Sequence, residues 1–113
     1  MTGSTVVMVS ASSQNEAEKI AKELVEKKLA ACVSIIPNMR SIYIWEGKVE
    51  DSEEYLMIIK TRGELFEQVK RAIQDLHSYK IPEIISLPIT HALEDYVRWI
   101  NEVTLVGPGV QDS

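Results

Sequence analysis

Residues 41–61 read SIYIWEGKVEDSEEYLMIIKT, and this stretch decides the fold. Two β-rich runs flank Glu46-Gly47, a dipeptide suited to a tight hairpin because glycine adopts a positive φ without steric cost. Neither run alternates cleanly between apolar and polar residues, and residues 56–59 are apolar throughout. A strand that is apolar on both sides is covered on both sides. A domain of this size has one layer of helices, which covers one face of the sheet. We predict that another copy of the chain covers the second face.

Short β runs and amphipathic stripes alternate along the rest of the chain. They predict strands over 5–11, 31–36 (interrupted at 37–38 and resuming at 41) and 83–89, and helices over about 15–29, 65–76 and 92–103. Residues 15–18 (NEAE) have the form of a capping box, and residues 13–16 (SQNE) share its spacing, so two starts of the first helix stay open. Residues 61–64 (TRGE) offer another capping box.

The resulting order of elements, β-α-β-β-α-β-α, predicts an α+β fold. Its first six elements match the ferredoxin-like sandwich, with both helices on one face. The additions are a long hairpin between the second and third strands and a C-terminal helix. In that fold the first and third strands are central and the second and fourth are edges. Proline cannot donate to a strand ladder and is confined to edges or bulges. Pro37 falls in the second strand and Pro88 in the fourth, which agrees with the predicted order.

The arm before the hairpin turn is long for so small a protein. From Ala31 to Trp45 the chain could extend about 50 Å at ~3.3 Å per residue, whereas a compact chain of this size has a radius of gyration of about 13 Å. The hairpin must therefore bend or overhang its own domain. An overhanging hairpin that carries Tyr43, Ile44 and Trp45 is an aggregation hazard unless a partner covers it. We predict a homo-oligomer built through this arm, with the number of subunits left open.

Composition narrows the class of protein. The 113 residues predict one domain, over 1–105, followed by a flexible tail at 106–113. The net charge of −5 and the absence of a Lys/Arg cluster argue against a nucleic-acid partner. No apolar run approaches the ~20 residues that a membrane span needs. The single cysteine fits a reducing compartment, so we expect a cytoplasmic protein.

Few side chains point to chemistry. No nucleophile–base motif is evident, so we do not expect an enzyme. Cys32 and His77 are a possible soft-ligand pair for copper or zinc. Other interpretations stay open: Cys32 also fits a small buried apolar residue, which the sequence alone favours, and His77 fits a cation beside a helix C-terminus. Residues 77–84 (HSYKIPEI) place His, Tyr, Lys and Glu in one helix-to-strand loop, where function is common.

Taken together, these segments resemble a known family. Residues 30–33 (AACV), 41–48 (SIYIWEGK), 59–61 (IKT), 77–84 (HSYKIPEI) and 96–99 (YVRW) are similar, in order and spacing, to the CutA family of divalent-cation tolerance proteins. The resemblance covers nearly the whole chain. It implies a ferredoxin-like subunit, a homotrimer and a role in tolerance of copper and other divalent metals. Because the PII signalling proteins share the fold, a trimeric signalling or scaffold module that binds a small ligand or partner protein is the alternative.

The resemblance also implies particular site residues. Cys32 and His77 fall at the family positions associated with copper, Cu(II) first among possible metals. Ser78 stands where the family motif has proline. The remaining matches lie where the family clusters residues around an intersubunit cleft: Trp45, Lys60, Tyr79, Glu83 and Trp99.

Overall fold

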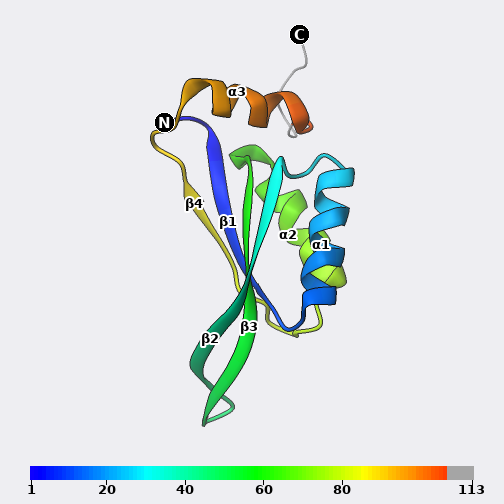
Figure 1. Ribbon diagram of the computed structural model, residues 1–113, viewed down its shortest axis with the longest axis vertical. Coiled ribbons are helices and arrows are strands. Elements are labelled where there is room, and N and C mark those ends of the chain that lie inside the picture. Colours follow the sequence, from blue (N-terminus) through cyan, green and yellow to red (C-terminus); the bar gives the residue numbers. More distant parts are fainter. Residues whose placement is uncertain (107–113) are drawn as a thin grey trace.

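Within residues 1–106, the part of the chain that the computed structural model describes, four antiparallel strands form one sheet (Figure 1). The elements in chain order are β1 (Ser4–Ala11), α1 (Gln14–Glu26), β2 (Cys32–Trp45), β3 (Lys48–Arg62), the 3₁₀ helix η1 (Gly63–Leu65), α2 (Phe66–Leu76), β4 (Ile84–Pro88) and α3 (Glu94–Val103). The sheet order is β2-β3-β1-β4, which confirms the predicted central and edge strands. The tail predicted at 106–113 lies, from residue 107 on, outside the described residues.

Proline placement shapes the two edge strands. Pro88 is the last residue of β4. Pro37 lies in a register shift between Ile36 and Met39, where Asn38 adopts a φ of 63°. The predicted interruption at residues 37–38 takes the form of a β-bulge, which accommodates the residue that cannot donate. Pairing resumes at Met39 rather than at Ser41, and β2 continues to Trp45.

Helices α1 and α2 pack on one face of the sheet and enclose the core (Figure 1). Alternate residues of the central strands point into this core and are fully buried: Val7, Val9, Met57 and Ile59. They meet helix residues that are also fully buried: Ala17, Ile20, Leu24, Val69 and Ile73. The two helices therefore cover one face of the apolar strands, and within the subunit they leave the other face of the sheet uncovered.

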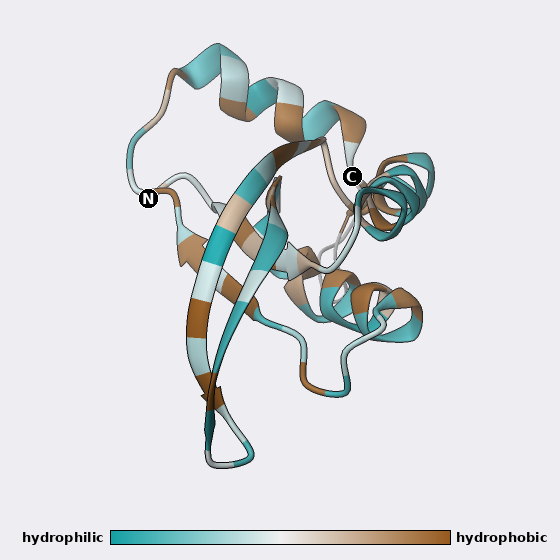
Figure 2. Cartoon of the chain, turned by 60° about the horizontal axis from the view of Figure 1, so that its bottom comes forward, coloured by the Kyte–Doolittle hydropathy of each residue, from teal (hydrophilic) through white to brown (hydrophobic). Residues whose placement is uncertain are grey.

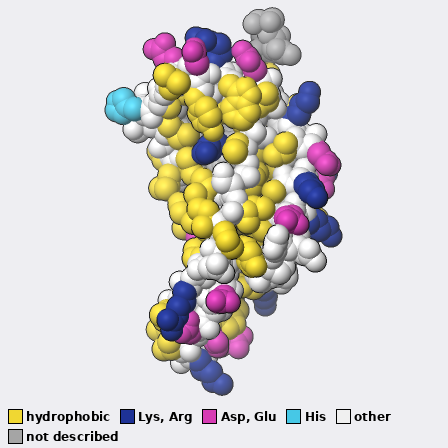
Figure 3. Space-filling view, viewed as in Figure 1, with side chains coloured by type: hydrophobic (Ala, Val, Ile, Leu, Met, Phe, Trp, Pro, Cys, Tyr) yellow, Lys and Arg dark blue, Asp and Glu magenta, His cyan; other side chains and the backbone are white. Residues whose placement is uncertain are grey.

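The second face of the sheet, which we call the open face, carries the intervening residues. Val6 pairs with Leu87 and Met8 with Ile85, and the side chains of Ile85 and Leu87 are 49% and 50% exposed. Figure 3 shows hydrophobic side chains in a band that runs from beneath α3 toward the hairpin. None of the helices in the described part of the chain is long and apolar enough to cross a membrane.

The β2–β3 hairpin extends well beyond the sheet, as predicted. The chain measures 51 × 27 × 23 Å, and the hairpin forms one end of the long axis (Figure 1). Glu46 and Gly47 at its turn both have positive φ, 51° and 78°, as a tight two-residue turn requires. Hydrophobic residues recur along the arm (Figure 2), and Ile42 and Ile44 are 64% and 74% exposed.

Helix α3 is fixed across the end of β3. Ile100, a residue of this helix, is fully buried. The Arg62 guanidinium donates hydrogen bonds to the Thr104 hydroxyl, at 2.9 Å, and to the Asn101 carbonyl. The start expected near residue 92 moves to Glu94, since Leu93 is the extended residue before the helix.

Of the two starts left open for the first helix, the structure selects the earlier. Ser13 is the N-cap, and its hydroxyl accepts the Glu16 amide at 3.1 Å. The helix ends at Glu26, three residues before the expected end, where Lys28 turns into the left-handed region with a φ of 60°. The capping box predicted at 61–64 is wrong: Arg62 precedes η1 and makes no side-chain cap bond, because a 3₁₀ turn tightens the entry to α2.

Replacing the N-cap tests this helix start. We expect Ser13→Ala to lower the free energy of unfolding by about 1 kcal/mol, because one helix amide loses its acceptor. Asn15→Ala, two residues on, serves as the control and is expected to change stability by less than about 0.5 kcal/mol. Urea unfolding at fixed protein concentration measures both. A larger loss in Asn15→Ala than in Ser13→Ala would place the cap at residue 15.

Candidate functional site

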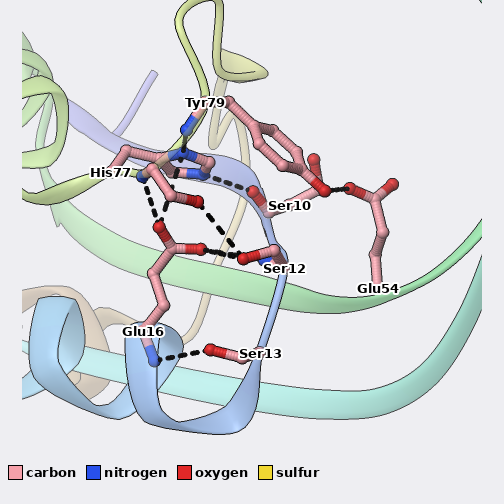
Figure 4. A network of polar contacts seen from close by, with 8 residues as sticks. Ser10, Ser12, Ser13, Glu16, Glu54, His77 and Tyr79 are labelled. Atoms are coloured by element: carbon pink, nitrogen blue, oxygen red, sulfur yellow. Dashed lines mark hydrogen bonds and ion pairs between the residues drawn. The ribbon is translucent and has the colours of Figure 1, made fainter.

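His77 ends α2 and is held on both ring nitrogens. Nε2 lies 2.7 Å from the Ser10 carbonyl, and Nδ1 accepts the Tyr79 amide at 3.0 Å (Figure 4). These partners place the proton on Nε2, because a carbonyl only accepts and an amide N–H only donates. The His77 side chain is 0% exposed. A metal ion that used either nitrogen would have to displace one of these two bonds.

Glu16 ties the start of α1 to the loop that follows α2. Its carboxylate accepts the amide and hydroxyl of Ser12, at 2.9 and 2.8 Å, and the backbone amide of Ser78 (Figure 4). Burial raises the pKa of Glu16, but hydrogen bonds from the backbones and hydroxyls of Ser12 and Ser78 outweigh it and lower the pKa to about 2. The family motif has proline at the position of Ser78, and proline has no amide hydrogen. Serine there supplies a donor that proline could not.

Tyr79 reaches from the same loop to a buried carboxylate on β3. Its hydroxyl donates to Glu54 Oε2 at 2.9 Å, and Glu54 is 4% exposed (Figure 4). Burial, with further contributions from Glu54, raises the pKa of Tyr79 to about 12. The phenol therefore stays protonated and remains a hydrogen-bond donor at neutral pH.

A cavity of about 650 Å³ opens beside this pair, and we call it the hairpin pocket. It lies between the hairpin, the end of β1 and the loop after α2. Three of the predicted cleft residues line it: Trp45, Tyr79 and Glu83. Tyr43 and Glu54 line it as well, and a volume of this size falls within the range of small-molecule sites.

The other two predicted cleft residues lie elsewhere. The Lys60 ammonium is 5.8 Å from the ring centroid of Tyr96, and that ring packs at 5.5 Å against Trp99 on α3. Lys60 and Trp99 thus belong to a second aromatic group under α3, and one subunit does not bring them to the hairpin pocket. Their role in a cleft between subunits remains a prediction.

Cys32 starts β2 and is partly exposed, with a free thiol. It pairs with Lys60, whereas His77 contacts Ser10, which pairs with Leu56. The two positions are four residues apart along the strands, about 13 Å at ~3.3 Å per residue. Metal–ligand bonds are about 2.0–2.3 Å, so a single subunit does not bring Cys32 and His77 to one ion. Residues 1–106 also contain no group of three or more His, Cys, Asp and Glu side chains that could hold a metal.

Glu16 and Glu54 are the site residues that the sequence did not single out. Glu16 was visible only as a possible helix cap, and its partner Ser78 is 62 positions away. Glu54 lies in an acidic run of β3 and does not stand out by its residue type. The pairing of β2 with β3 could have indicated it, because it places Glu54 on the same side of the hairpin as Ser41 and Tyr43.

The fold and the site define a class: ferredoxin-like α+β subunits with an overhanging hairpin, an open apolar sheet face and a polar–aromatic pocket at the base of the arm. Residues 5–103 match the model of the family described as CutA1 divalent ion tolerance protein. The chain belongs to this family.

Individual relatives agree. The divalent-cation tolerance protein CutA of Archaeoglobus fulgidus is 47% identical over 96 residues, covering 85% of this chain and 93% of the relative. The protein of the same description from Thermus thermophilus is 42% identical over 99 residues, covering 88% and 96%. The solved structure of the divalent cation tolerance protein (Cut A1) from Thermus thermophilus superposes with a TM-score of 0.87 at 42% identity, covering 89% of this chain and 98% of that one.

Proposed function

We propose that this chain works as a homotrimer that binds divalent metal ions, Cu(II) first among them, in divalent-cation tolerance. The observation that carries the assembly is the open face: apolar residues of β1 and β4 lie beside an overhanging hairpin with exposed Ile42 and Ile44. Such a surface favours association because burying it removes apolar area from water. The subunit number of three comes from the family resemblance.

For the metal, the support is the family together with Cys32. Its thiol is free and partly exposed on the open face, and thiolate is a ligand that copper prefers. In a trimer the further ligands would come from another subunit. His77 was the second predicted ligand; since both its nitrogens are bonded within the subunit, its contribution requires the loop at 77–83 to release one of them.

Calorimetric titration with Cu(II) and Zn(II) tests the metal proposal. We expect the wild type to bind and the Cys32→Ala/His77→Ala variant to lose binding, because a thiolate and an imidazole are removed together. His91→Ala, which removes the other histidine, an exposed one, is the control and is expected to bind as the wild type does. Absence of binding in the wild type, or unchanged binding in the double variant, would contradict the proposal.

A second function is favoured by the hairpin pocket. A trimeric signalling or scaffold module would bind a small ligand or partner there, and a cavity of about 650 Å³ suits a small molecule. In both proposals the protein binds rather than catalyses, because its sequence carries no nucleophile–base motif. We place it in the cytoplasm because its only cysteine fits a reducing compartment.

A further inference from the structure

The hairpin pocket contains a buried carboxylate without a cationic partner. Glu54 is 4% exposed, and none of the ion pairs found within residues 1–106 involves it. Within the described part of the chain, its side chain makes one hydrogen bond, which Oε2 accepts from the Tyr79 hydroxyl. Buried charges in proteins are paired with an opposite charge or coordinate a metal. The Tyr79 phenol supplies a hydrogen-bond donor but no positive charge, because a protonated phenol is neutral.

The surroundings of Glu54 suit an organic cation better than a metal ion. A divalent metal needs several oxygen, nitrogen or sulfur ligands, and the described residues offer no such group. The pocket instead presents aromatic side chains. Tyr79 contacts the carboxylate, the Tyr43 hydroxyl accepts from Ser52, two residues before Glu54, at 3.4 Å, and Trp45 lies farther out along the hairpin. Aromatic faces attract ammonium groups, and the attraction grows when the site is shielded from water.

The charged residues of the neighbouring loop do not neutralise the pocket. Lys80 and Glu83 both line it, and their opposite charges balance each other. Both side chains are exposed, so water screens their charges. The charge that remains without a partner among the described residues is therefore that of Glu54, a buried carboxylate that lines a cavity of about 650 Å³.

We propose that the hairpin pocket binds a small organic ammonium compound, with its nitrogen at Glu54 beside Tyr43 and Tyr79 and its remainder extending toward Trp45. The proposal deepens the second function above and rests on it, because it names the class of ligand for that pocket. The ligand is recognised by one positive charge and by an apolar body that packs on aromatic rings.

Matched probes test the charge requirement. Choline and hexylammonium are titrated into the wild-type assembly by calorimetry, alongside their uncharged counterparts dimethylbutanol and hexanol. We expect the cations to bind about tenfold or more tightly than the alcohols. Glu54→Gln, which keeps an acceptor for Tyr79, should weaken cation binding by about tenfold and leave alcohol binding unchanged. Glu53→Gln removes the same charge from the adjacent, exposed residue on the other side of β3 and should bind as the wild type does.

The outcomes separate the ligand class from the function on which it rests. Equal binding of cations and alcohols to the wild type would overturn the ammonium preference and leave a ligand pocket in place. Failure of all four probes to bind would overturn the ammonium proposal and argue that the pocket is filled in the assembly. If Glu54→Gln does not fold, the comparison of cation with alcohol on the wild type decides alone. The mass of each variant is measured separately, so a change in assembly is not mistaken for a change in binding.

Discussion

Ile85→Glu is expected to convert the proposed trimer into a monomer of 12.8 kDa. Ile85 is 49% exposed on the open face, so an isolated subunit tolerates a carboxylate there. In an assembly that covers this face, the same carboxylate is buried without a partner, which costs several kcal/mol for each subunit. Light scattering coupled to size separation measures the mass, and circular dichroism verifies that the subunit remains folded.

Val25→Glu is the matched control for this change. Val25 is 44% exposed on α1, on the side of the sheet away from the open face, and receives the same charge. We expect this variant to keep the wild-type mass. If Ile85→Glu also keeps it, the interface does not use the open face, and the explanation of the apolar strands fails.

Glu16→Gln is expected to lower the free energy of unfolding by about 2–3 kcal/mol, because charge-assisted hydrogen bonds from Ser12 and Ser78 are weakened. The Glu16 side chain is 10% exposed, whereas its partners Ser12 and Ser78 are exposed, so solvent screens these bonds in part. Urea unfolding at one protein concentration measures the loss. Glu26→Gln, on the exposed side of the same helix, is the control and should change stability by less than about 0.5 kcal/mol.

The same carboxylate gives stability a defined pH dependence. The pKa of Glu16 falls from an ordinary 4.5 to about 2 in the folded chain, so folding favours the ionised form. Because Ser12 and Ser78 are exposed and water screens part of this effect, we expect it to contribute about 2 kcal/mol. That stabilisation is fully present above pH 4.5 and is lost as the pH falls through about 2. The stabilities of wild type and Glu16→Gln should therefore converge toward pH 2. Parallel curves across this range would show that Glu16 does not hold the loop as described.

Much of the fold could be predicted because it depends on local pattern. The apolar β runs, the order of the elements and the positions of Pro37 and Pro88 gave the strand order, and Glu46-Gly47 with the long arm before it gave the overhanging hairpin. The boundaries of elements were predicted less well, namely the point where β2 resumes after the bulge at 37–38 and the start of α2 after a 3₁₀ turn. Both depend on how the backbone adjusts to the packing around it. Sequence spacing carries no information on that adjustment.

The site was only partly predictable, because its contacts join distant segments. Trp45, Tyr79 and Glu83 line one pocket within the subunit, whereas Lys60 and Trp99 lie with Tyr96 under α3. The cleft between subunits that the family resemblance implies stays a prediction. Cys32 and His77 were predicted as a ligand pair from the chemistry of their side chains alone. In the structure Cys32 lies beside Lys60 on β3, whereas His77 follows α2 and contacts Ser10, so the two are far apart. The role of Glu54 depends on its burial and on the hydrogen bond that it accepts from Tyr79, and neither can be predicted from the acidic run in which it lies.

The mass of the wild-type protein in solution tests the proposed assembly most directly. Static light scattering on the purified chain, over a range of concentrations, should give three times the 12.8 kDa of one chain. A mass of 12.8 kDa at every concentration would contradict it, because the open face and the hairpin would then remain exposed to water.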